Sequence, residues 1–199
     1  SEKSLCGTDG KITALCDHTG KGVMAQGSGL HYLEFRLAQV HSAGVELGVC
    51  KESLANTPEL PGSLTDRTSA YAYCTQTGLL RVGGKMRSAS KSQMAAAAQD
   101  DVIGLLLDLR GKTSSLSVYK QDRTSLDAAK NRTEPRAQLL GTVDCLPGPV
   151  CWFVTTNTEM DMVQIGSRRS DPPMGRTSES KLNLRKRERA RGTHTHTHT

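Results

Sequence analysis

The stretch Asp100-Asp101-Val102-Ile103-Gly104-Leu105-Leu106-Leu107-Asp108-Leu109 is the most informative part of this chain. Its near-continuous apolar run is too short for a typical helix and fits a β-strand that is buried on both faces. The two aspartates in front of the run indicate a turn. Leu116 to Tyr119 alternates apolar and polar residues. We therefore predict that it pairs with the run as a hairpin across Arg110-Gly111-Lys112.

Short segments of similar character recur along the chain, separated by Gly, Pro, Ser, Asn and Asp. Apolar residues alternate with polar ones in several of them, which is the period of a half-buried strand. The further predicted strands are Leu30 to Val40, Gly44 to Cys50, Ala70 to Cys74, Leu79 to Val82, and a last pair, Val150 to Thr155 with Met160 to Ile165, joined by Thr156 to Glu159. About eight short strands favour an all-β antiparallel sandwich or barrel.

Two segments break this pattern. Lys91 to Gln99 contains four consecutive alanines, and we expect it to form a turn or two of helix. Gln121 to Gln138 is polar and charged, and we expect a long inserted loop there. A connection of that length is either functional or mobile.

The composition predicts one folded domain followed by a tail. Hydrophobic residues make up 36% of the 199 residues and aromatic residues only 4%, enough for one core but not two. Residues 1–166 hold equal numbers of basic and acidic side chains, so the net charge of +6 lies wholly in residues 167–199. We predict an N-terminal extension over 1–21 packing on the domain, a sandwich over 22–166, and a disordered basic tail over 167–199 that ends in a His-Thr repeat.

Six segments together resemble the SPRY domain, the core of the B30.2 domain. Asp100 to Leu109 resembles the family's Gly-Asp-Val-Ile-Gly-Cys-x-Leu-Asp segment, with Asp100 in place of the Gly. Leu116-Ser117-Val118-Tyr119-Lys120 is similar to its Leu-Ser-Phe-Tyr-Lys. The other four are Gly29 to Phe35, Val45 to Val49, Tyr71 to Lys85, and Leu146 to Val150, all in the family's order. The chain departs from the pattern in its long insertion after Lys120 and in having a single tryptophan, Trp152. These departures indicate a divergent member with an aliphatic core.

The resemblance implies two curved antiparallel sheets and a ligand surface made by loops at one end. The corresponding loops here are Ser53–Ser69, Gln76–Gln99 and Lys120–Gln138, with the turn Thr156–Glu159. The candidate partner-binding residues are Arg67, Tyr71, Tyr73, Gln76, Arg81, Arg87, Asp122, Arg123 and Asn157. Taken singly, each is better explained as a solvated loop residue or a core tyrosine, whereas for the whole set this explanation and a binding role are equally supported.

Catalytic and metal-binding patterns are not apparent in the sequence. No phosphate loop, nucleophile elbow or zinc-ligand spacing occurs, so we expect no enzyme activity, no cofactor, no metal and no small-molecule substrate. The six cysteines lack a Cys-x-x-Cys pair and are interpreted as buried thiols in a reducing compartment, with disulfides as the alternative. No apolar window approaches the length of a membrane span.

Two functional hypotheses follow. The first is a protein-interaction module that binds a protein or short peptide, as SPRY domains do, including as substrate receptors of ubiquitin ligases. The second is a structural subunit of a large ribonucleoprotein or ciliary assembly that uses the tail. The tail cations Arg185, Lys186, Arg187, Arg189 and Arg191 suit nuclear import, contact with nucleic acid or another anionic surface, or a solubilising end. We expect a cytoplasmic protein, with nuclear import as the alternative.

Overall fold

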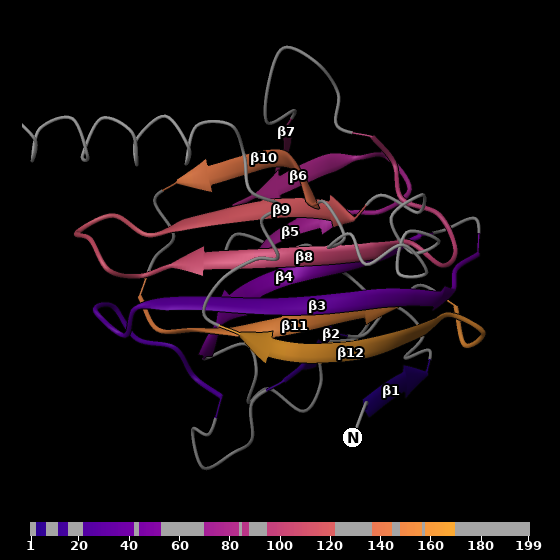
Figure 1. The fold of residues 1–199 in the computed structure, drawn as a ribbon, viewed down its shortest axis with the longest axis horizontal. Coiled ribbons are helices and arrows are strands. Elements are labelled where there is room, and N and C mark those ends of the chain that lie inside the picture. The colour runs from indigo at the N-terminus through magenta and orange to yellow at the C-terminus, as the bar shows by residue number, and fades with distance from the viewer. Residues whose placement is uncertain are drawn as a thin grey trace, which may run out of the picture.

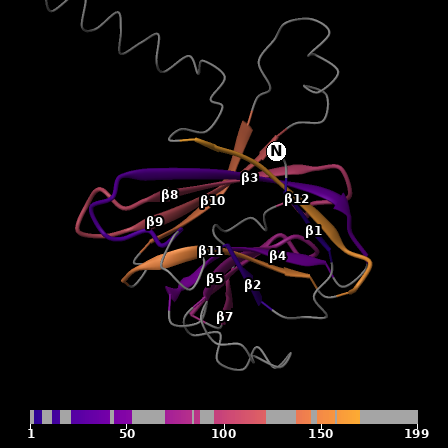
Figure 2. The ribbon, with the colours of Figure 1, turned by 90° about the horizontal axis from the view of Figure 1, so that it is seen from below.

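The computed structural model of this chain describes most of the predicted sandwich. The described residues are 3–6, 12–15, 22–41, 44–52, 70–83, 85–87, 95–121, 137–144, 148–156 and 158–169. Within them the chain forms twelve strands in two six-stranded sheets. The sheets lie face to face as two layers (Figures 1 and 2). The fold is therefore the predicted all-β sandwich.

Every strand pairing among these residues is antiparallel. Sheet I has the order β1 (Lys3–Cys6), β12 (Met162–Arg169), β3 (Leu30–Gln39), β8 (Val102–Asp108), β9 (Ser115–Gln121) and β10 (Ala137–Asp144). Sheet II has the order β2 (Ile12–Ala14), β11 (Val150–Thr156), β4 (Val45–Lys51), β5 (Ala70–Cys74), β6 (Leu79–Val82) and β7 (Lys85–Arg87). The chain crosses repeatedly between the two sheets, because consecutive strands such as β3 and β4 belong to different layers.

The alternating apolar residues form the core between the sheets. Leu33, Phe35 and Leu37 of β3 have no exposed surface, and neither do Val45, Leu47 and Val49 of β4. One face of β8 is equally buried, through Ile103, Leu105 and Leu107. Alternation places every second side chain on the same face of a sheet, so both sheets turn an apolar face inward.

The outer face of β8 is less covered than the sequence suggested. Val102 and Leu106 are only partly buried, so the strand is fully buried on one face and not on both. Gly104, which lies on the same outer face, is buried. A Cβ at this position would lie 2.0 Å from the Tyr32 hydroxyl, so only glycine lets the Tyr32 ring lie across β8. This accounts for the glycine inside an otherwise bulky apolar run.

The expected last hairpin does not form. β11 pairs with β2 and β4 in sheet II, whereas β12 pairs with β1 and β3 in sheet I. The turn at 158–161 therefore lies between strands of the two layers and not between two neighbouring strands. Local alternation predicts a strand, but it carries no information about which strand lies beside it.

Other boundaries differ from the sequence-based prediction. Residues 95–99 have no helical structure, although the rest of the predicted helix lies outside the described residues. β10 was not predicted, and it begins at Ala137, inside the segment expected to be a loop. β12 continues to Arg169, three residues beyond the expected domain end at Gly166. At the other end of the chain, β1 and β2 are edge strands of sheets I and II, so residues of the N-terminal extension are part of the sandwich.

Leu105→Ala tests the core directly. Leu105 has no exposed surface, so we expect the change to lower the free energy of unfolding by about 2–5 kcal/mol through the cavity it leaves. Leu106→Ala, one residue along on the partly buried outer face, is the matched control and should cost clearly less. Urea denaturation followed by tryptophan fluorescence measures both, and equal losses would contradict the assignment of faces.

Candidate interaction site

Several connections between strands gather at one end of the sandwich. In sheet I, β3 ends at Gln39 opposite Met162, the first residue of β12. In sheet II, β4 begins at Val45 opposite Thr156, the last residue of β11. The described residues 40, 41, 44, 75–78, 95–101 and 158–161, which connect strands, therefore meet there. We name this region the Asp161 end.

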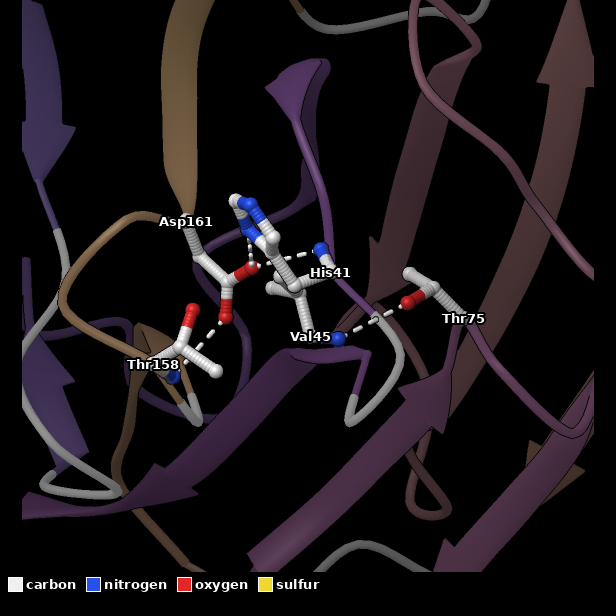
Figure 3. A network of polar contacts seen from close by, with 5 residues as sticks. All are labelled: His41, Val45, Thr75, Thr158 and Asp161. Atoms are coloured by element: carbon white, nitrogen blue, oxygen red, sulfur yellow. Dashed lines mark hydrogen bonds and ion pairs between the residues drawn. The ribbon is translucent and has the colours of Figure 1, made fainter.

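A buried carboxylate holds two of these connections together. Asp161 has no exposed surface, and its Oδ1 accepts a hydrogen bond from the His41 backbone N–H at 2.8 Å. The same oxygen lies 3.3 Å from Nδ1 of the His41 ring. Its Oδ2 accepts a hydrogen bond from the backbone N–H of Thr158 at 3.0 Å, as Figure 3 shows. Asp161 thereby joins its own turn to the connection between β3 and β4.

A threonine joins sheet II to the same region. Thr75 is buried, and its Oγ1 accepts a hydrogen bond from the backbone N–H of Val45 at 2.8 Å (Figure 3). The backbone N–H of Thr75 donates in turn to the Val45 carbonyl oxygen at 2.9 Å. The Thr75 carbonyl oxygen accepts a bond from the Ala97 N–H at 2.8 Å. The turn after β5 is thus bonded both to the start of β4 and to the segment before β8.

A second buried carboxylate fixes the segment that leads into β8. The side chain of Asp101 is 2% exposed. Its Oδ2 accepts a hydrogen bond from the Ala98 N–H at 2.7 Å, and the same oxygen lies 2.8 Å from the Lys120 ammonium. Lys120 also donates to the Ala96 carbonyl oxygen at 3.1 Å. Charged hydrogen bonds of this kind are stronger than neutral ones. Residues 96–101 are therefore held against β9.

Asp100 and Asp101 point to different environments, as expected for a turn before a buried strand. The side chain of Asp100 is 56% exposed and lies 3.3 Å from Arg36, whereas that of Asp101 is buried. Asp100 adopts a left-handed backbone conformation with φ of 68°, which aspartate tolerates better than most residues. The two carboxylates do not converge as an acid–base pair would.

Tyr73 and Arg81, two of the predicted binding residues, have structural contacts. Tyr73 has no exposed surface, and its hydroxyl donates to the Ala95 carbonyl oxygen at 2.7 Å. Burial, reinforced by the charge of Asp101, raises the pKa of Tyr73 well above its usual value, so the hydroxyl keeps its proton. The Arg81 guanidinium lies 2.8 Å from a carboxylate oxygen of Glu46, and both side chains are largely buried. The structure therefore corrects the expectation that these two side chains offer a contact surface.

The remaining predicted binding residues divide into three groups. Gln76 is exposed at the Asp161 end, whereas Tyr71 is partly buried against the core. Arg87 ends β7, and its side chain lies outside the described residues. The others also lie outside them: Arg67, Asp122, Arg123, Asn157 and the tail residues Arg185, Lys186, Arg187, Arg189 and Arg191.

The anchors of the predicted loops show which of them share an end. Gln121 and Ala137, which lie near the two ends of the predicted insertion, face each other at the Asp161 end. The connection over 53–69 instead joins β4 to β5 where Cys50 faces Ala70, at the opposite end of sheet II. Arg67 belongs to that connection. The expectation of one surface built from all four predicted loops is therefore corrected: the connection over 53–69 is anchored at the other end, and the predicted loop Gln76–Gln99 contains β6 and β7.

Sequence reasoning missed the surface residue that stands out most at the Asp161 end. Met160 is 62% exposed beside the buried Asp161, whereas the other strongly exposed large apolar side chain of the described residues, Leu139, belongs to β10. Glu159, Gln99 and Asp100 are exposed at the same end as Met160. An exposed, flexible thioether at an end that also exposes polar side chains is suited to protein contact. Met160 was assigned to a strand, and only the turn geometry places it at the surface.

Two classes of functional feature are absent from the described part of the chain. No group of three or more His, Cys, Asp or Glu side chains there lies close enough to hold a metal ion. The same residues contain no helix that is long and apolar enough to span a membrane.

Comparison with known proteins gives similar structures but no family match. No protein-family model matches the chain, and no curated protein matches it. Solved structures that resemble it include the SPRY domain of human HERC1, which is 16% identical, with 72% of this chain and 76% of that chain covered and a TM-score of 0.47. Peanut lectin with a nine-residue peptide is 10% identical, with coverages of 81% and 79% and a TM-score of 0.34.

Asp161→Ala tests how the Asp161 end is held. Removing the carboxylate leaves the His41 and Thr158 amides without their acceptor, so we expect a loss of about 1–3 kcal/mol in the free energy of unfolding. Hydrogen exchange at these two amides should accelerate. Glu159→Ala, an exposed neighbour in the same turn, should change neither quantity. An unchanged exchange rate in the Asp161 variant would show that the turn is held by other contacts.

Proposed function

We propose that this chain is a non-catalytic interaction module that binds a protein or a short peptide through the Asp161 end. The observation that carries the proposal is the pair of buried carboxylates, Asp161 and Asp101, which hold separate connections in fixed positions on one rigid core. A surface that is ordered before binding loses less conformational entropy when its partner arrives. Binding residues are commonly found on connections that a rigid scaffold positions in this way.

The chemistry of the exposed side chains suggests what kind of partner this surface suits. Met160 offers an adaptable apolar contact, and the polar or acidic residues Gln76, Gln99 and Asp100 are exposed at the same end of the sandwich. An apolar centre inside a polar rim is the usual anatomy of a protein–protein interface. We infer that the partner presents an apolar side chain flanked by hydrogen-bond donors.

The finer assignments rest on the SPRY resemblance of the sequence motifs. A role as the substrate receptor of a ubiquitin ligase is part of this proposal, because SPRY domains often act in that way. The cytoplasm is the proposed location, since such ligases work there. Identifying the partner tests the substrate-receptor role, because that role requires binding to a ubiquitin-ligase substrate.

A second candidate function is favoured by the charge distribution. The whole net charge of +6 lies in residues 167–199, while the rest of the chain is neutral. A basic tail of this kind attracts nucleic acid or another anionic surface. In this alternative the chain is a structural subunit of a large assembly, anchored through the tail, and it enters the nucleus if the tail also serves as an import signal.

Met160→Glu tests the main proposal. A charge at the centre of the apolar contact should weaken binding at least tenfold, the size of effect expected for a central interface residue. Thr113→Glu is the control, because Thr113 is exposed in the turn between β8 and β9 at the opposite end of the sandwich and should leave binding unchanged. Quantitative affinity purification of the tagged full chain identifies proteins lost only with the Met160 variant, and calorimetry then measures their affinity. Equal capture by both variants would contradict the proposal.

A tail variant separates the two functions. Replacing Arg185, Lys186, Arg187, Arg189 and Arg191 by alanine removes the basic cluster without altering the described strands. On the main proposal, partners lost with Met160→Glu remain bound to this variant. If the tail variant instead loses its partners, and binding of the unaltered chain falls steeply with salt, the structural-subunit function is supported.

A further inference from the structure

Two cysteines face each other across neighbouring strands of sheet II. Cys50 of β4 and Cys151 of β11 are paired in register, and their sulfur atoms lie 3.8 Å apart. Neither residue has any exposed surface, and both are in the thiol form. They pack with Ala70, Ala72 and Phe153 in a small cluster separate from the main core.

We propose that Cys50 and Cys151 form a reversible disulfide that joins β4 to β11, with a low-molecular-weight disulfide such as oxidised glutathione as the oxidant. Sequence reasoning left buried thiols and disulfides as alternatives, and spacing along the chain does not distinguish them. Among Cys50, Cys74 and Cys151, whose side chains the structure describes, the register brings Cys50 and Cys151 together. This inference is independent of the proposed binding function.

The strand geometry is compatible with the bond. Opposed residues of antiparallel strands have Cα atoms about 4.5–5.5 Å apart, inside the range of about 4.4–6.8 Å found in disulfides. The sulfur atoms, now 3.8 Å apart, must approach by about 1.8 Å to reach bonding distance. Side-chain rotation and a small shift of the strands are sufficient for a movement of this size.

Cys74, the third buried cysteine of sheet II, has no cysteine opposite it on β4. It is also buried and in the thiol form, but the residue opposite it on β4 is Glu46. No other described cysteine faces it in the pairing register. Cys74 is therefore a matched control within the same sheet.

The reaction is a two-step thiol–disulfide exchange. The thiolate of one cysteine attacks a sulfur of oxidised glutathione, forming a mixed disulfide and releasing one glutathione thiolate, which takes up a proton. The thiolate of the second cysteine then displaces the other glutathione. The protein loses two hydrogen atoms, and one oxidised glutathione becomes two reduced molecules.

Burial makes the native thiols slow to react. The attacking sulfur atom must become accessible before the first step, so the reaction requires local opening of the cluster. A mild denaturant concentration should accelerate it. Once formed, the bond spans 101 residues of sequence and restricts the unfolded chain strongly.

Peptide mapping of the unaltered full chain tests the proposal. The protein is equilibrated with defined ratios of reduced to oxidised glutathione, remaining thiols are alkylated in denaturant, and the digest is analysed by mass spectrometry. We expect a disulfide-linked pair of peptides containing Cys50 and Cys151, and its loss on returning to reduced glutathione. Linkage of other cysteines instead, or no linkage even in fully oxidised glutathione, would overturn the proposal.

Variants add a second readout. Oxidation should raise the thermal midpoint of the unaltered chain by roughly 5–15 °C. The Cys74→Ala variant should show the same rise, whereas Cys151→Ala should show none. A rise of equal size in Cys151→Ala would contradict the assignment of the bond to this pair, and the mapping result on the unaltered chain stands even if a variant folds poorly.

Discussion

The contact between the inward faces of sheets I and II positions the rest of this domain. Leu33, Phe35 and Leu37 from one sheet and Val45, Leu47 and Val49 from the other have no exposed surface. Burial of apolar surface is the dominant favourable term in folding. Because β3 and β4, like β11 and β12, lie in opposite sheets, their connections must cross from layer to layer at the end of the sandwich.

Buried polar groups hold the connections at the Asp161 end in place. A carboxylate without exposed surface is costly unless hydrogen-bond donors surround it, and Asp161 and Asp101 are both placed where backbone N–H groups point at them. The same contacts that satisfy these charges hold the connections in place. Stability and the shape of the candidate interaction surface therefore depend on the same hydrogen bonds.

The outer face of sheet II shows how position changes the role of a residue. Arg81 looks like a surface cation in the sequence, yet it lies against Glu46 in a largely buried ion pair. Cys50 and Cys151 look like unrelated small apolar residues, yet the register brings their sulfur atoms within 3.8 Å. Contacts between residues that are distant in the chain thus decide chemistry that local pattern cannot reveal.

The sequence by itself determined the fold class and most of the strands, because alternation of apolar side chains is a local property that survives in the fold. β5 and β6 have the predicted bounds, and the turn at Asp100 was also predicted correctly. Only the tertiary structure decided that β11 and β12 belong to different sheets, that Tyr73 is buried, and that Met160 is exposed. Pairing and burial depend on which distant segments meet, and a single sequence does not encode that information locally.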